Sequence, residues 1–106
     1  MSAENRIIQI KSFLEKTPND PFLIYALGVE YVGLSDFEKA EEIYKGLLTS
    51  HPDYFATYYQ LAKVYEALDQ DDLAEKTYEL GMHKTEQLGE KHAYSELKSA
   101  YEELIF

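Results

Sequence analysis

The chain has 106 residues, enough for one compact domain, and its hydrophobic fraction of 45% is typical of a folded protein. Its formal net charge of -10 disfavours binding to nucleic-acid phosphates or to acidic lipid surfaces, so we expect neither kind of partner. The absence of cysteine excludes disulfides, thiol catalysis and thiolate metal ligands.

The first segment, "MSAENRIIQIKSFLEK", carries charges where a signal peptide has an apolar stretch. The apolar runs elsewhere are far shorter than the roughly 20 residues that span a bilayer. We therefore expect a cytoplasmic protein without a membrane partner.

Apolar residues recur at helical spacing along the whole chain, which predicts an all-α fold. Asp20 before Pro21 is a typical helix start, and Ser35 with Glu38 has the spacing of a capping box. Gly89 lies where a helix end favours a positive φ angle. The predicted helices cover residues 3–16, 21–32, 36–49, 54–67, 71–87 and 91–105.

The sequence repeats itself when it is shifted by 34 residues. Small residues at the repeated positions lie on apolar helix faces, where they allow paired helices to approach closely beside larger neighbours. The matching pairs are Tyr25/Tyr59, Leu27/Leu61, Tyr31/Tyr65, Ala40/Ala74, Glu41/Glu75 and Tyr44/Tyr78.

This spacing and these residues resemble the tetratricopeptide-repeat family, whose pattern is W-x2-L-G-x2-Y, then A-x3-F, then P. The first unit has Leu27-Gly28-x2-Tyr31, Ala40-x3-Tyr44 and Pro52 at the corresponding places. Ile24 and Tyr58 replace the tryptophan of the two units, and Glu86 replaces the second closing proline.

The resemblance implies a helical array that forms a right-handed superhelix, with residues 1–106 as a single domain. Two full repeats, 20–53 and 54–87, are then flanked by an N-terminal half-repeat over 1–19 and a capping helix over 88–106. It also implies a small stand-alone repeat protein that binds another protein.

In this family, the first helix of each repeat lines a concave groove in which peptides or partner helices dock. The resemblance implies a groove that is apolar and aromatic at one end and charged at the other. Such a groove suits a peptide or an amphipathic helix with an apolar anchor and basic residues. Burial in the core is the alternative for this apolar face, above all for Val29 and Val32, because the large rings of Phe22 and Tyr25 are harder to bury completely. The groove residues by this resemblance are Phe22, Tyr25, Val29, Tyr59, Lys63 and Glu66.

Family members that bind chaperone tails hold a C-terminal carboxylate with lysine, arginine and asparagine side chains. The matching positions of this chain supply no positive charge, which argues against a carboxylate-binding role. These positions hold Tyr25, Val29, Gln60, Glu90 and Tyr94.

The sequence lacks a Gly-rich phosphate loop, a Ser-His-Asp arrangement and a zinc signature. Glu79 and His83 share a helix face, but two ligands without a third rarely form a specific metal site. We expect no catalytic residue, no cofactor and no metal, so the protein is not expected to be an enzyme.

The alternative function is self-assembly, in which the groove or the chain end is covered by a second copy. The chain closes with "ELIF", an apolar end that is costly to leave exposed. A cap folded back on its own last repeat is the other explanation for this tail.

Overall fold

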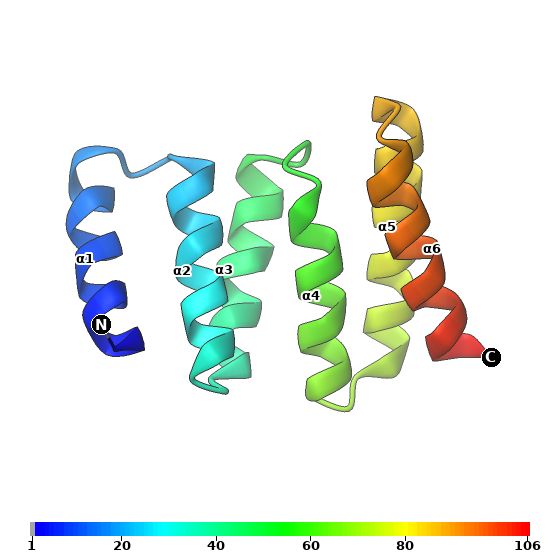
Figure 1. Cartoon of the computed structure of the whole chain (residues 1–106), viewed down its shortest axis with the longest axis horizontal. Coiled ribbons are helices and arrows are strands. Elements are labelled where there is room, and N and C mark those ends of the chain that lie inside the picture. The colour runs from blue at the N-terminus through cyan, green and yellow to red at the C-terminus, as the bar shows by residue number, and fades with distance from the viewer. Residues whose placement is uncertain (1) are drawn as a thin grey trace. The chain divides into compact units, whose positions relative to one another are not determined.

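A computed structural model describes residues 2–106 and contains, within them, six α-helices and no β-strand (Figure 1). The predicted all-α fold is confirmed. The helices are α1 (Ala3–Lys16), α2 (Pro21–Gly33), α3 (Phe37–Ser50), α4 (Ala56–Ala67), α5 (Asp71–Leu88) and α6 (Lys91–Ile105).

The predicted helix boundaries agree with the structure to within one residue, except at the start of α4. The prediction placed this start at Tyr54, whereas the helix begins at Ala56. The Tyr54 carbonyl accepts hydrogen bonds from the Thr57 amide at 3.2 Å and from the Thr57 hydroxyl at 2.8 Å. This turn holds Tyr54 outside the regular helix.

The predicted helix ends are confirmed at two positions and wrong at a third. The Asp20 carboxylate caps α2 by accepting from the Phe22 amide at 3.0 Å, and Gly89 closes α5 with φ of 73°. The Ser35 cap is wrong, since Ser35 has φ of 58° and Asp36 instead accepts from the Lys39 amide at 3.2 Å. The adjacent Asp36 is therefore the N-cap residue of α3, and its carboxylate accepts a hydrogen bond from a free amide of the first turn.

The chain divides into two compact units, Met1–Pro52 and Asp53–Phe106, which we call the N-terminal unit and the C-terminal unit. In the N-terminal unit, α2 packs against both α1 and α3. In the C-terminal unit, α5 packs against both α4 and α6. That residues 1–106 act as one repeat domain with the predicted repeat limits stays a prediction.

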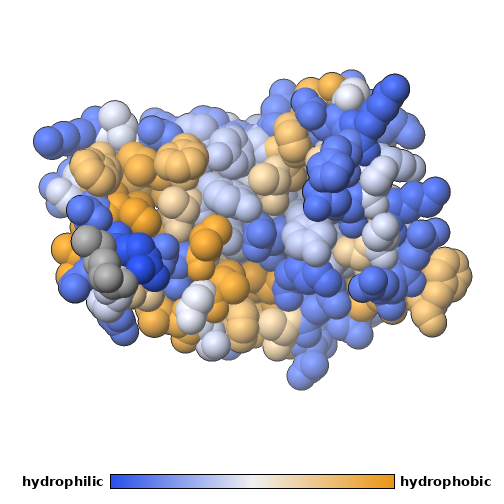
Figure 2. All heavy atoms as spheres, viewed as in Figure 1, coloured by the Kyte–Doolittle hydropathy of each residue, from blue (hydrophilic) through white to orange (hydrophobic). Residues whose placement is uncertain are grey.

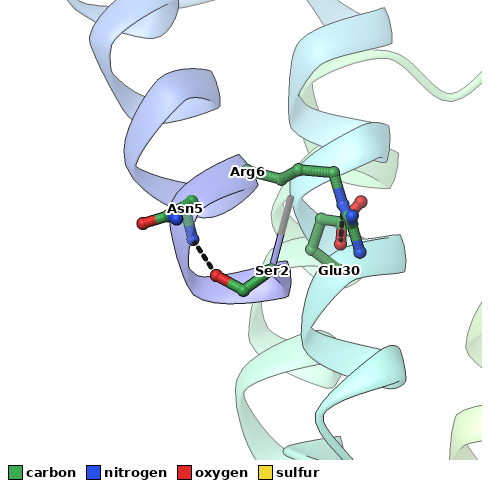
Figure 3. A network of polar contacts seen from close by, with 4 residues as sticks. All are labelled: Ser2, Asn5, Arg6 and Glu30. Atoms are coloured by element: carbon green, nitrogen blue, oxygen red, sulfur yellow. Dashed lines mark hydrogen bonds and ion pairs between the residues drawn. The ribbon is translucent and has the colours of Figure 1, made fainter.

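Polar contacts fix the start of α1 and join it to α2 (Figure 3). The Ser2 hydroxyl accepts from the Asn5 amide at 3.1 Å, which caps the helix. Arg6 forms an ion pair with Glu30 at 2.9 Å, so a charged contact lies beside the apolar packing of α1 on α2.

A tyrosine packed against a glycine forms the core of the N-terminal unit. Tyr44 on α3 is completely buried, and its ring lies directly against Gly28 on α2. A Cβ atom at Gly28 would lie 2.7 Å from the tyrosine Cζ and 2.9 Å from its Cδ1. The predicted pairing of small and large residues on facing helices is therefore confirmed at this position.

The C-terminal unit has its own close approach at Gly81, in the middle of α5. A Cβ atom there would lie 2.7 Å from the Cβ of Tyr58 on α4 and 3.1 Å from the Cδ1 of Leu97 on α6. Because Gly81 has no side chain, α5 can approach both neighbouring helices closely at the same point along its length. The long α5 is thereby held between α4 and α6.

We expect Gly28→Ala to lower the free energy of unfolding by roughly 1–3 kcal/mol, because the added methyl group overlaps the Tyr44 ring. Gly46→Ala on α3 is the matched control, since no atom lies within 4 Å of a Cβ there. Gly46→Ala should raise the free energy of unfolding by up to about 1 kcal/mol, because alanine has a higher helix propensity than glycine. Urea unfolding followed by circular dichroism measures both. A Gly28→Ala protein as stable as the wild type would contradict this account.

Candidate functional site

The first helix of each repeat carries a line of side chains that does not form the core. Residues on α2 and α4 separated by three or four positions share a face because the helix turns about 100° per residue. We call these faces the α2 stripe, formed by Phe22, Tyr25, Val29 and Val32, and the α4 stripe, formed by Ala56, Tyr59, Lys63 and Glu66.

The α2 stripe presents apolar side chains to the surface. Phe22 is 65% exposed and Val29 is 41% exposed, whereas Tyr25 and Val32 are half-buried. On the face drawn in Figure 2, apolar residues gather over the N-terminal unit, while the surface of the C-terminal unit is mostly hydrophilic. Val29 is thus not part of the buried core.

Tyr25 connects the α2 stripe to the core beneath it. Its ring centre lies 6.0 Å from that of Tyr44, with a tilt of 44° between the ring planes. The Tyr44 hydroxyl is buried and has no hydrogen-bond partner among the described residues. Burial raises the pKa of Tyr44 above its usual value, and the neighbouring Tyr25 raises it further. The hydroxyl therefore stays protonated.

The α4 stripe is held together by charges. The Lys63 ammonium lies 5.6 Å from the centre of the Tyr59 ring and 3.6 Å from the Glu66 carboxylate. The Tyr78 hydroxyl donates to the same Glu66 oxygen at 2.5 Å, and the Tyr78 ring meets Tyr59 edge-on at 6.4 Å. Burial raises the pKa of Tyr78, and its hydrogen bond to Glu66 raises it further.

The two stripes therefore occupy equivalent positions, but the α2 stripe is apolar where the α4 stripe is charged. Val29 and Val32 of α2 correspond to Lys63 and Glu66 of α4 under the 34-residue shift. The same shift relates Tyr44, whose hydroxyl has no acceptor in the described chain, to Tyr78, whose hydroxyl has one. The sequence analysis predicted Tyr44 and Tyr78 only as packing residues. The replacement of Val32 by Glu66 at the equivalent position was the available signal that only one of the two hydroxyls has an acceptor.

A polar hollow of about 310 Å³ lies within the C-terminal unit, where α6 passes Tyr59 of the α4 stripe. Two carboxylates from α6, Glu96 and Glu103, line it together with Ser95 and Ser99. The sequence had assigned α6 only as a capping helix, because nothing in its pattern indicated which of its faces lies beside Tyr59.

The six predicted groove residues thus fall into two groups of three. Phe22, Tyr25 and Val29 lie together on α2 of the N-terminal unit. The others, Tyr59, Lys63 and Glu66, lie together on α4 of the C-terminal unit and contact one another. That all six line one groove stays a prediction.

Within residues 2–106, no three histidine, aspartate or glutamate side chains gather closely enough to hold a metal ion. Over the same residues, no helix combines the length and the apolar character needed to cross a membrane.

A family model for tetratricopeptide repeats matches residues 31–102, which is more than half of the chain. The chain belongs to the tetratricopeptide-repeat family. A comparison with curated proteins found no match.

Three solved structures have a similar fold. A tetratricopeptide-repeat domain protein from Salinibacter ruber is 36% identical, with a TM-score of 0.79 over 83% of this chain and 89% of that one. The TPR2B domain of yeast Sti1, solved as a complex with pHsp70, is 15% identical, with a TM-score of 0.89 over 96% and 82%. PcrH, solved with the chaperone-binding region of PopD, is 13% identical, with a TM-score of 0.87 over 96% and 77%.

The two equivalent tyrosines of this repeat protein should respond differently to loss of the hydroxyl. Tyr44→Phe removes a buried donor without an acceptor, so the free energy of unfolding should stay unchanged or rise by about 1 kcal/mol. Tyr78→Phe removes a hydrogen bond to a carboxylate and should lower it by about 1–2 kcal/mol. Thermal and urea unfolding of the two variants test this difference. An equal decrease in the free energy of unfolding of both variants would show that the Tyr44 hydroxyl has an acceptor.

Proposed function

We propose that this tetratricopeptide-repeat protein is a protein-interaction module that binds a peptide or helix of a partner through the exposed faces of its first helices. The observation that carries the proposal is the exposure of Phe22 and Val29 beside Tyr25 on a single helix. Large apolar side chains in such a group are typical of binding surfaces, and aromatic residues often dominate their affinity.

Two structures with this fold support the proposal. The yeast Sti1 domain was solved with pHsp70, and PcrH was solved with a region of PopD. In both structures, a protein with this fold is in complex with another protein or a region of one. Their identities of 15% and 13% carry over the fold alone, so the partner of this chain is to be inferred from its own residues.

The C-terminal unit contributes charged side chains, not apolar ones, to the proposed binding. Glu66, Glu96 and Glu103 lie on or beside the α4 stripe, and Lys63 already pairs with Glu66. Basic residues of a partner would complement these carboxylates, consistent with the net charge of -10. In this proposal, apolar anchors on α2 supply affinity, while Lys63 and Glu66 supply selectivity.

The proposal includes a cytoplasmic location and assigns no catalytic residue or cofactor. Glu66, the carboxylate of the α4 stripe, accepts a hydrogen bond from Tyr78 and forms an ion pair with Lys63 of its own unit. A binding role requires no other arrangement of these side chains.

We expect Phe22→Asp to reduce partner binding at least tenfold, because it places a charge within the apolar α2 stripe. Phe22 is 65% exposed, so the helical content should survive. Leu80→Asp on α5 is the matched control, since Leu80 is 61% exposed and lies outside both stripes. Proteins captured from native lysate are identified by mass spectrometry with wild type and both variants. Equal capture by wild type and a folded Phe22→Asp protein would refute the proposed surface.

Self-assembly is the second candidate, and one observation favours it. Phe106 is 94% exposed, so this last ring does not pack on its own unit, whereas Ile105 is 36% exposed and Leu104 is half-buried. A second copy that covered this tail would remove apolar surface from water.

Solution mass tests this candidate directly. If the tail joins copies, light scattering should show a dimer or larger assembly for the full chain and a monomer after removal of Ile105 and Phe106. Phe106→Asp should have the same effect, because a charge disfavours burial of the tail. An identical mass for all three forms would exclude assembly through the tail.

A further inference from the structure

A buried hydroxyl without an acceptor lies beneath the α2 stripe. Tyr44 is 0% exposed, and among residues 2–106 nothing accepts a hydrogen bond from its hydroxyl. Folded proteins pair nearly all of their buried polar groups, so such an exception needs an explanation. The raised pKa of Tyr44, caused first by burial and then by Tyr25, keeps this group a hydrogen-bond donor.

The equivalent hydroxyl of the C-terminal unit shows where the missing acceptor belongs. Tyr78 donates to Glu66, which occupies the position on α4 that Val32 occupies on α2. The Tyr44 ring contacts Gly28 and lies 6.0 Å from the Tyr25 ring. By equivalence with Tyr78 and Glu66, we infer that its hydroxyl lies beside Tyr25 and Val32, next to the α2 stripe.

The neighbours of this hydroxyl also limit the charge of an acceptor. In the C-terminal unit, the acceptor is a carboxylate accompanied by the Lys63 ammonium at 3.6 Å. The residue equivalent to Lys63 on α2 is Val29, which supplies no charge. A carboxylate brought to this place would lose its hydration without gaining that cation, whereas a neutral amide loses much less hydration free energy.

We propose that the α2 stripe binds a partner segment in which an asparagine or glutamine side chain, flanked by apolar residues, accepts the hydrogen bond of Tyr44. The apolar neighbours cover Phe22 and Val29, which are 65% and 41% exposed. A side-chain amide suits this site better than a main-chain carbonyl, because the acceptor must project past Tyr25 and Val32 to reach the hydroxyl. This inference rests on the proposed function and specifies the chemistry of the partner.

The test uses a phage-displayed library of random peptides of about twelve residues as the probe, selected on the full chain. Synthetic copies of the enriched peptides are titrated against wild type, Tyr44→Phe and Phe22→Asp. Tyr101→Phe is the matched control, because it removes one tyrosine hydroxyl from α6 and leaves both stripes intact. Circular dichroism verifies that each variant is folded.

We expect enriched peptides to bind Tyr44→Phe about five- to tenfold more weakly than wild type, with unchanged binding to Tyr101→Phe. Replacing their asparagine or glutamine with the isosteric aspartate or glutamate should weaken binding to wild type by a similar factor. Equal affinity for wild type and Tyr44→Phe would overturn the inference, and so would tighter binding of the acidic peptides.

The same titrations separate this inference from the proposed function. Peptides that lose affinity for Phe22→Asp but not for Tyr44→Phe would leave the binding surface in place and remove the role of the hydroxyl. Peptides insensitive to both substitutions, or a library that yields no binder, would refute both. Loss of affinity in both variants would support both.

Discussion

The packing of a tyrosine on the second helix against a small residue on the first is the contact on which each unit depends. In the N-terminal unit, the Tyr44 ring lies so close to Gly28 that no side chain fits between them. In the C-terminal unit, Tyr78 and Ala62 occupy the equivalent positions, and both are 0% exposed. Two helices can approach closely only where one of them presents little side-chain volume, so these positions set their spacing.

The same packing brings the buried tyrosine hydroxyl of the second helix against the first helix. The C-terminal unit satisfies this hydroxyl internally, since Tyr78 donates to Glu66 and Lys63 balances the charge. The N-terminal unit has valines at both equivalent positions and leaves its hydroxyl without an acceptor in the described chain. One unit is thus closed by its own polar network, while the other presents an apolar surface with a donor beneath it.

Most of the fold was predictable because the periodic signals are local. Six helices, the Asp20 cap and the positive φ of Gly89 all follow from residue types at short spacing. The failures lie in turns where neighbouring residues compete. At Ser35 the adjacent Asp36 provides the cap, and at Tyr54 a turn bonded to Thr57 delays the start of α4. Small differences in geometry decide such competitions, and the sequence pattern does not encode them.

The sequence by itself determined the repeat and the helices, because both depend on spacing along the chain, whereas the six residues of the predicted binding surface were implied by the resemblance to the family. Only the tertiary structure decided which of these residues are exposed and which are joined to one another. Glu66 meets Tyr78, twelve residues away on the next helix, and the Tyr44 hydroxyl finds no such partner among the described residues. Burial and hydrogen bonding depend on how neighbouring helices meet, and that is fixed only when their side chains are packed together.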